Sequence, residues 1–191
     1  MSECQRSKKA AKNLTLALGA KGDIIECGVF QGQTTIALAK VLKSFDSPKK
    51  IYACDTYDGL PYDGREGIDD MLKKGECSSP FKEFWTNVCN AGVQDYIIPI
   101  PGLVEETLLS KLSEKKFCFA FLDMDLYEPT SYVYKFLKNR ISIGGVIGYH
   151  DYKFERCPGI ETVVDKEMDR DMYRMFDDHT ANCAWLQKVK K

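Results

Sequence analysis

Acidic side chains stand where short apolar runs of this sequence end. The residues at these positions, together with one histidine, are Glu26, Asp55, Asp123, Asp125, His150 and Asp151. Carboxylates held close together repel one another and raise one another's pKa, so a purely structural protein has little reason to gather them. A single acid at one strand end would be an ordinary helix N-cap, but a set of them implies a positively charged ligand. The pattern therefore predicts a site for a cationic group or a metal ion.

These side chains can meet only if the apolar runs are parallel strands. The runs cover residues 23–27, 50–55, 95–100, 117–123 and 144–151. Helix-like segments alternate with them, at residues 34–42, 80–91, 105–112, 131–139 and 159–168. This alternation predicts an α/β fold with one doubly wound, mostly parallel sheet, whose strands end at a common ligand-binding edge. Two further runs, 172–176 and 183–189, are joined by a short loop, which predicts a C-terminal antiparallel hairpin and seven strands in all.

Length and charge limit the classes of protein to consider. The chain has 191 residues, which suits a single domain over residues 1–191, with an amphipathic N-terminal helix in residues 1–22. Its formal net charge is −1, so no overall field would hold nucleic acid or an acidic membrane. No apolar run reaches membrane-spanning length. Several of the eight cysteines lie inside apolar runs, as buried thiols do in a reducing compartment, so we expect a cytoplasmic protein.

Residues 56–79 form the longest stretch without helix or strand periodicity, and they are rich in glycine, aspartate and lysine. A loop of this length in a compact domain is usually a functional lid or a disordered segment. We therefore predict a lid over the ligand site, with a solvated loop as the alternative.

The turn after the first predicted strand could receive a ligand. Gly28 and Gly32 allow tight turning and close approach to a ligand, and the helix that follows offers free N–H groups. The dinucleotide fingerprint needs a second glycine two residues after the first, but that position holds Phe30. This ranks nicotinamide and flavin cofactors below S-adenosylmethionine. Asp55, about one βα unit later, is placed to accept hydrogen bonds from both ribose hydroxyls of such a cofactor.

Several short segments occur in the order found in a known family. They are Glu26-Cys27-Gly28-Val29 with Gly32, Asp55-Thr56-Tyr57-Asp58-Gly59-Leu60-Pro61, Lys74-Gly75-Glu76, Asp123-Met124-Asp125-Leu126-Tyr127-Glu128-Pro129-Thr130, Gly144-Gly145 and Cys157-Pro158-Gly159. Together they resemble the macrocin O-methyltransferase family of antibiotic-sugar methyltransferases, and the Asp-x-Asp-Leu-Tyr-Glu-x-Thr segment is the most specific. The resemblance covers about residues 23–168 and implies a Rossmann-like, class I methyltransferase fold that binds S-adenosylmethionine.

The resemblance also implies roles for individual residues. The cofactor-binding residues that it implies are Glu26, Gly28, Val29, Phe30, Gly32, Thr34, Thr35, Asp55, Thr56, Gly102 and Asp123. The candidate ligands of a magnesium ion are Asp123, Asp125, His150 and Asp151. Asp123, Asp125 and His150 are the candidate catalytic residues. Spacing alone does not separate metal ligand from base between Asp123 and Asp125.

The implied reaction is methylation of a small hydroxylated molecule, with a sugar hydroxyl as the first choice of acceptor. A hydroxyl is a poor nucleophile while protonated, and a divalent cation lowers the pKa of an oxygen that it binds. A nearby carboxylate then accepts the proton, and the aligned oxygen attacks the sulfonium methyl group in line. Oxygen ligands favour Mg²⁺, with Mn²⁺ as the second choice. Family members often dimerise, which leaves a homodimer open.

His150 departs from the family pattern, which has an aspartate at this position. A nitrogen ligand shifts metal preference from magnesium toward manganese, iron or zinc. His150 could equally be a neutral group that contacts the substrate. Two alternatives follow: a metal-independent methyltransferase that uses His150 as the base, and an S-adenosylmethionine-binding protein without turnover.

Overall fold

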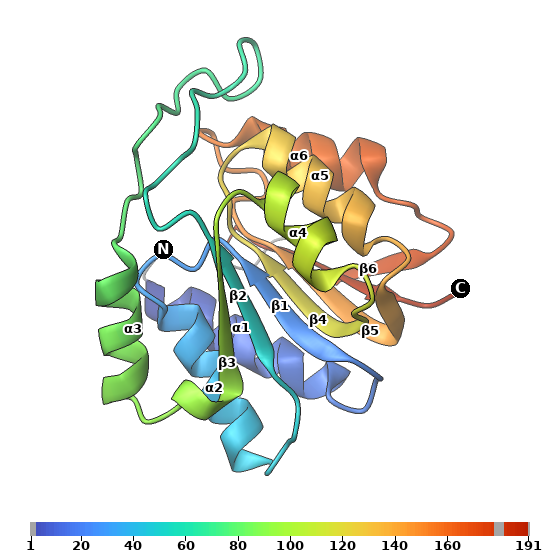
Figure 1. Cartoon of the computed structure of the whole chain (residues 1–191). Coiled ribbons are helices and arrows are strands. Elements are labelled where there is room, and N and C mark those ends of the chain that lie inside the picture. The colour runs from blue at the N-terminus through green and yellow to red at the C-terminus, as the bar shows by residue number, and fades with distance from the viewer. Residues whose placement is uncertain (1–2, 178–181, 191) are drawn as a thin grey trace.

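The computed structural model describes residues 3–177 and 182–190, and in this part of the chain seven strands form one sheet (Figure 1). The strand order is β3-β2-β1-β4-β5-β7-β6. Neighbours among β1 to β5 pair in parallel, whereas β7 pairs antiparallel with both β5 and β6. The predicted α/β fold with a C-terminal antiparallel hairpin is therefore confirmed. Residues 178–181, in the predicted hairpin loop, lie outside the described residues.

The helices and strands have the following bounds. The strands are β1 (Asp23–Cys27), β2 (Ile51–Asp55), β3 (Ile97–Pro101), β4 (Phe117–Leu122), β5 (Ile141–Tyr149), β6 (Tyr173–Asp177) and β7 (Ala184–Lys188). The α-helices are α1 (Glu3–Ala17), α2 (Gln33–Ser44), α3 (Phe81–Asn90), α4 (Val104–Leu112), α5 (Tyr127–Leu137) and α6 (Pro158–Thr162). Within residues 3–177 and 182–190, no helix is both long enough and apolar enough to cross a membrane.

Helices cover both faces of the sheet. Figure 1 shows α1, α2 and α3 on one face and α4, α5 and α6 on the other. Each face has its own buried cluster, with Leu38 and Phe84 in the first and Leu108 and Val133 in the second. Strand β4 is buried along its whole length, which explains why this run carries no polar side chain before its end. Burial on both faces leaves the ends of the strands as the place where polar side chains can reach a ligand.

One predicted helix is shorter than expected. The sequence predicts a helix over residues 159–168, but α6 ends at Thr162 and a π-helical turn, Val163–Glu167, follows. The Glu167 carboxylate accepts hydrogen bonds from the hydroxyls of Tyr127 and Ser131 on α5, at 2.5 and 2.6 Å. These tertiary contacts stabilise the wider turn, and a π-turn of this kind is a local adjustment that periodicity does not reveal.

Candidate active site

The parallel strands leave the sheet through residues in the left-handed region of backbone space. Shortly after each of the strands β1 to β5, one residue has a positive φ, between 48° and 125°. In chain order these residues are Phe30, Tyr57, Gly102, Asp125 and Asp151. Positive φ is uncommon for most residues other than glycine, and such strain concentrates at functional sites. Each strand therefore turns sharply at the same edge of the sheet, and the turns bring the predicted site residues over that edge.

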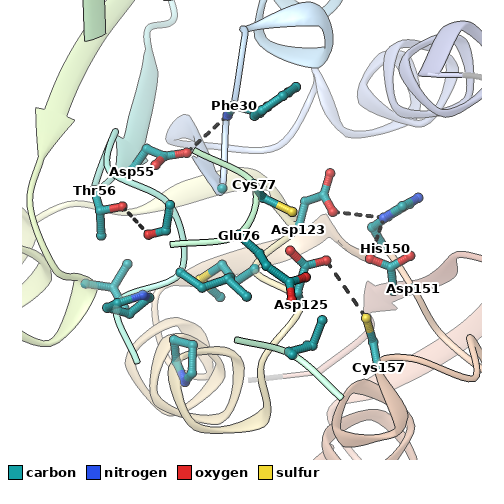
Figure 2. Close-up of a pocket in the computed structure, with 18 of the residues that line it drawn as sticks. Phe30, Asp55, Thr56, Glu76, Cys77, Asp123, Asp125, His150, Asp151 and Cys157 are labelled. Atoms are coloured by element: carbon teal, nitrogen blue, oxygen red, sulfur yellow. Dashed lines mark hydrogen bonds and ion pairs between the residues drawn. The ribbon is translucent and has the colours of Figure 1, made fainter. Parts of the chain in front are cut away.

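Asp55 ties the glycine turn to the end of β2. Its Oδ2 accepts hydrogen bonds from the backbone N–H groups of Val29 and Phe30, at 2.7 and 3.0 Å (Figure 2). Its Oδ1 accepts one from the N–H of Tyr57 at 2.8 Å. A carboxylate offers about four lone-pair positions, so acceptor capacity remains for a ligand in the adjoining cavity. Asp55 thus shapes the turn and also lines the cavity.

Gly28 allows the ends of β1 and β4 to approach each other closely. A Cβ at this position would lie 1.9 Å from the carbonyl oxygen of Asp123, and the φ of Gly28 is 81°. Any other residue would have to push the two strand ends apart. Glycine here lets the turn after β1 lie directly against the backbone of Asp123.

The implied cofactor-binding residues divide into two groups. Gly28, Phe30, Asp55, Thr56, Gly102 and Asp123 line the cavity. The others, Glu26, Val29, Gly32, Thr34 and Thr35, lie buried or half-buried beneath the turn and do not line it. Burial raises the pKa of Glu26 to about 8. Thr34 shares a hydrogen bond with Ser7 of α1, and a Cβ at Gly32 would lie 2.8 Å from the Phe84 ring. This second group supports the turn from below.

Asp123, His150 and Asp151 converge on one point. Nδ1 of His150 lies 2.8 Å from Oδ1 of Asp123 and 2.8 Å from Oδ2 of Asp151. Burial disfavours the imidazolium form, but Asp123 and then Asp151 outweigh it and raise the pKa of His150 to about 10. Burial likewise opposes the charge of Asp123, yet His150 and Arg6 hold the pKa of its carboxyl below the usual range. A protonated His150 thus lies between the two carboxylates.

The same three side chains fit a divalent cation. One ligand atom from each, all within 4.8 Å of one another, can face a common centre. Adjacent ligands of an octahedral ion with bonds of about 2.1 Å lie about 3 Å apart, close to the spacing found here. Two carboxylates and an imidazole form a donor set that suits Mg²⁺ or Mn²⁺.

Asp125 belongs to a neighbouring group with Asp151 and Cys157. Its Oδ1 lies 3.9 Å from the Cys157 sulfur (Figure 2). Burial, and then the charges of Asp123 and Asp151, raise the pKa of Asp125 to about 8. Burial also raises the pKa of the Cys157 thiol, which therefore keeps its proton. Over the part of the chain that the structure describes, no lysine, arginine or histidine forms an ion pair with Asp125.

The cavity above these residues has a volume of about 320 Å³. Its apolar lining comes largely from the predicted lid, α4 and the loop after β5, and includes Leu60, Leu72, Leu103, Val104 and Phe154. Figure 2 shows the carboxylates of Asp123, Asp125 and Glu76 gathered in its middle. An apolar cavity with a few convergent polar groups is typical of a small-molecule site.

The segment over residues 56–79 packs onto the body of the protein through its own acids. Asp69 is 1% exposed, and its carboxylate accepts hydrogen bonds from the N–H groups of Tyr127 and Gly159, at 2.7 and 3.0 Å. These groups lie at the starts of α5 and α6, where N–H groups lack helical partners. Glu76 in turn forms a 2.8 Å ion pair with Arg156, and both line the cavity. The segment is therefore anchored to the body of the protein beside the cavity.

The sequence patterns did not identify Arg6 as a site residue. Its guanidinium Nη1 lies 2.8 Å from Oδ2 of Asp123, and Arg6 lines the cavity. A basic residue in an N-terminal amphipathic helix gives no local sign that it reaches a distant strand end. Only the packing of α1 beside α2 and β4 brings it there.

Comparison with known proteins agrees with this geometry. The sequence profile of the family described as macrocin-O-methyltransferase (TylF) matches residues 5–182. The 8-demethyl-8-(2,3-dimethoxy-alpha-L-rhamnosyl)-tetracenomycin-C 4'-O-methyltransferase of Streptomyces olivaceus is 28% identical over 150 residues, 74% of this chain and 57% of that protein. The demethyldecarbamoylnovobiocin O-methyltransferase of Streptomyces niveus is 26% identical over 153 residues, 76% of this chain and 57% of that protein. This chain therefore spans less than two thirds of the length of either relative.

A solved structure shows the same fold. The O-methyltransferase NovP superposes with a TM-score of 0.84 at 21% sequence identity. The superposition covers 97% of this chain and 80% of that one. The class I methyltransferase fold implied by the sequence motifs is thereby confirmed.

Proposed function

Because the chain belongs to the macrocin-O-methyltransferase (TylF) family, we propose that it transfers a methyl group from S-adenosylmethionine to a hydroxyl oxygen of a small molecule. The family match confirms the resemblance seen in the sequence motifs. The Streptomyces olivaceus relative is named for a rhamnosyl acceptor, which supports a sugar hydroxyl as the methylated group. We further propose that a divalent cation takes part.

One observation carries this proposal: the acids at the ends of separate strands meet around one cavity. Asp55, Asp123, Asp125 and Asp151 all line it. Like charges gathered in a half-buried site need positive partners. A sulfonium cofactor and a metal ion supply such charge, and each has a distinct set of acids close by.

The glycine turn and Asp55 fit the methyl donor. S-adenosylmethionine, when bound, supplies an electrophilic methyl group on a sulfonium. Asp55 keeps acceptor capacity for ribose hydroxyls, and the absence of a side chain at Gly28 leaves space over the turn. The nearby Phe30 lines the cavity, where its ring provides apolar contact. These residues bind and orient the donor.

Asp123, His150 and Asp151 would hold the cation. The cation would favour the deprotonated form of the acceptor hydroxyl. His150 would have to lose its proton to serve as a ligand, because a protonated imidazole has no lone pair to offer. By holding the cation, Asp123 and Asp151 would also fix where the acceptor hydroxyl binds.

Asp125 is the residue proposed to accept the hydroxyl proton. Its carboxylate lines the cavity beside the cation group, while Asp123 and Asp151 are already engaged by His150. A base must lie within hydrogen-bond reach of the proton it removes, and the Asp125 carboxylate lies in the middle of the cavity near Glu76 and Asp123 (Figure 2). These features support a ligand role for Asp123 and a base role for Asp125. A neutral His150 that held the cation through Nδ1 would keep its other proton on Nε2 and have no lone pair left for the acceptor proton, which argues against His150 as the base.

A methyl-transfer assay tests this function. Radiolabelled S-adenosylmethionine is incubated with the protein and a panel of rhamnosides, other glycosides, nucleotide sugars and catechols. We expect label to enter one class of glycoside, to fall at least about 100-fold with EDTA and to return with Mg²⁺ or Mn²⁺. Transfer that survives EDTA would contradict the cation, and donor binding without transfer to any acceptor would favour a protein without turnover.

A further inference from the structure

The Asp123 carboxylate faces two different partners with its two oxygens. Oδ1 faces His150 and the proposed cation group, at 2.8 Å from Nδ1. Oδ2 faces Arg6 of α1, at 2.8 Å from Nη1. The side chains of Arg6 and Asp123 are only 17% and 13% exposed. The Arg6–Asp123 pair is thus a half-buried pair of opposite charges on the side of Asp123 away from His150.

This pair lies at the end of the cavity formed by the glycine turn. Gly28, which also lines the cavity, packs directly against the Asp123 backbone. Among the described residues that line the cavity, three have side chains that can carry a positive charge. They are Arg6, His150 and Arg156. His150 is held between two acids, and Arg156 pairs with Glu76 of the lid. Arg6 is therefore the arginine beside the turn.

The amino-acid part of S-adenosylmethionine carries a carboxylate and an ammonium group. A carboxylate that enters a half-buried site needs a charged partner, and a guanidinium can bind it through two parallel hydrogen bonds. At the glycine turn, the Arg6–Asp123 pair offers one positive and one negative charge. These charges complement the carboxylate and the ammonium group of the donor. The Arg6–Asp123 ion pair compensates both half-buried charges until a ligand binds.

We propose that Arg6 binds the carboxylate of the methyl donor and that Oδ2 of Asp123 accepts a hydrogen bond from the donor ammonium. This inference rests on the proposed function, since it concerns the same cofactor. It makes the N-terminal helix a part of the cofactor site. The competing explanation is that Arg6 only holds Asp123 in place, as a positioning residue for the cation group.

Decarboxylated S-adenosylmethionine separates these explanations, because it lacks only the carboxylate. Dissociation constants of both ligands are measured by titration calorimetry in EDTA for the wild type and for Arg6→Gln. We expect the wild type to prefer S-adenosylmethionine by about 10- to 100-fold, the range for a hydrogen bond between charged groups. We expect Arg6→Gln to lose that preference while its affinity for the decarboxylated ligand changes less than about threefold. Arg174→Gln is the matched control, because Arg174 is exposed on β6 and lies outside the cavity lining, and it should keep the wild-type preference.

A preference that Arg6→Gln retains, with both ligands weakened equally, would overturn the inference in favour of the positioning role. A wild type that binds both ligands equally would overturn it without any variant. If Arg6→Gln does not fold by circular dichroism, Arg6→Lys takes its place and should show a reduced preference, because it keeps the charge but loses the planar fork. If the wild type binds neither ligand, the proposed function itself fails. Each of the other results leaves the proposed function standing.

Discussion

Asp125→Asn is expected to lower kcat for methyl transfer by about 10²- to 10⁴-fold, the usual contribution of a general base. The amide is close in size to the carboxylate but cannot take up the acceptor proton. Asp125 has a positive φ of 61°, which asparagine also tolerates, so the fold should be retained. The dissociation constant for S-adenosylmethionine should stay within about threefold of the wild type, because the donor residues are unchanged.

The matched control for this substitution is Asp46→Asn. Asp46 is exposed, lies after α2 at the opposite end of the sheet and also has a positive φ, of 45°. It should keep wild-type kcat. The rate is best measured in single-turnover experiments, which report the chemical step rather than product release. A kcat for Asp125→Asn within about fivefold of the wild type would remove Asp125 from the base role.

Asp55→Ala is expected to weaken S-adenosylmethionine binding by about 100-fold. The substitution removes the proposed acceptor for the ribose hydroxyls, and a charge-assisted contact of this kind contributes about 1.5–3 kcal/mol. It also frees the N–H groups of Val29 and Phe30, so the glycine turn loses the anchor that shapes it. The two effects act on the same ligand and should add.

Titration calorimetry checks this loss, with Asp58→Ala as the control. Asp58 lies three residues further along the same loop, but its side chain is exposed and outside the cavity lining. The control should bind within about twofold of the wild type. Equal affinities for Asp55→Ala and the wild type would show that the donor does not use this strand end.

The sheet could be predicted from the sequence because its signals are local. The strands within the runs ending at Cys27, Asp55 and Asp123 are buried almost throughout, as central parallel strands are, and glycines or acids mark where each run stops. The alternation of these runs with helical segments is compatible with only a few arrangements of strands in a sheet. The third strand begins at Ile97, two residues later than predicted, because a 3₁₀ turn at Gln94–Tyr96 precedes it.

The candidate site was predictable only in part. Since parallel strands share a carboxyl edge, the meeting of Asp55, Asp123 and Asp151 followed from their places in the sequence. The contribution of Arg6 did not, because it depends on how α1 packs across the sheet. The position of residues 56–79 depends in the same way on Asp69, whose partners are 58 and 90 residues away in the chain. Contacts of this range leave no periodic signal.

The role of His150 could not be predicted from the spacing of residues alone. The sequence left it open between a metal ligand and a group that contacts the substrate. The structure places its Nδ1 at 2.8 Å from two carboxylates, where either a proton or a cation can compensate their charge. Proton and cation therefore compete for one position, and the donor set can be tested directly with a metal that X-ray scattering identifies.

The proposed cation site is tested most directly by the position of a cation in crystals soaked with Mn²⁺ and S-adenosylhomocysteine. We expect an anomalous scattering peak within bonding distance of Asp123 Oδ1 and Asp151, with the nucleoside beside Asp55 in the same cavity. Bound S-adenosylhomocysteine with no manganese peak among Asp123, His150 and Asp151, at saturating metal, would contradict the proposed cation site.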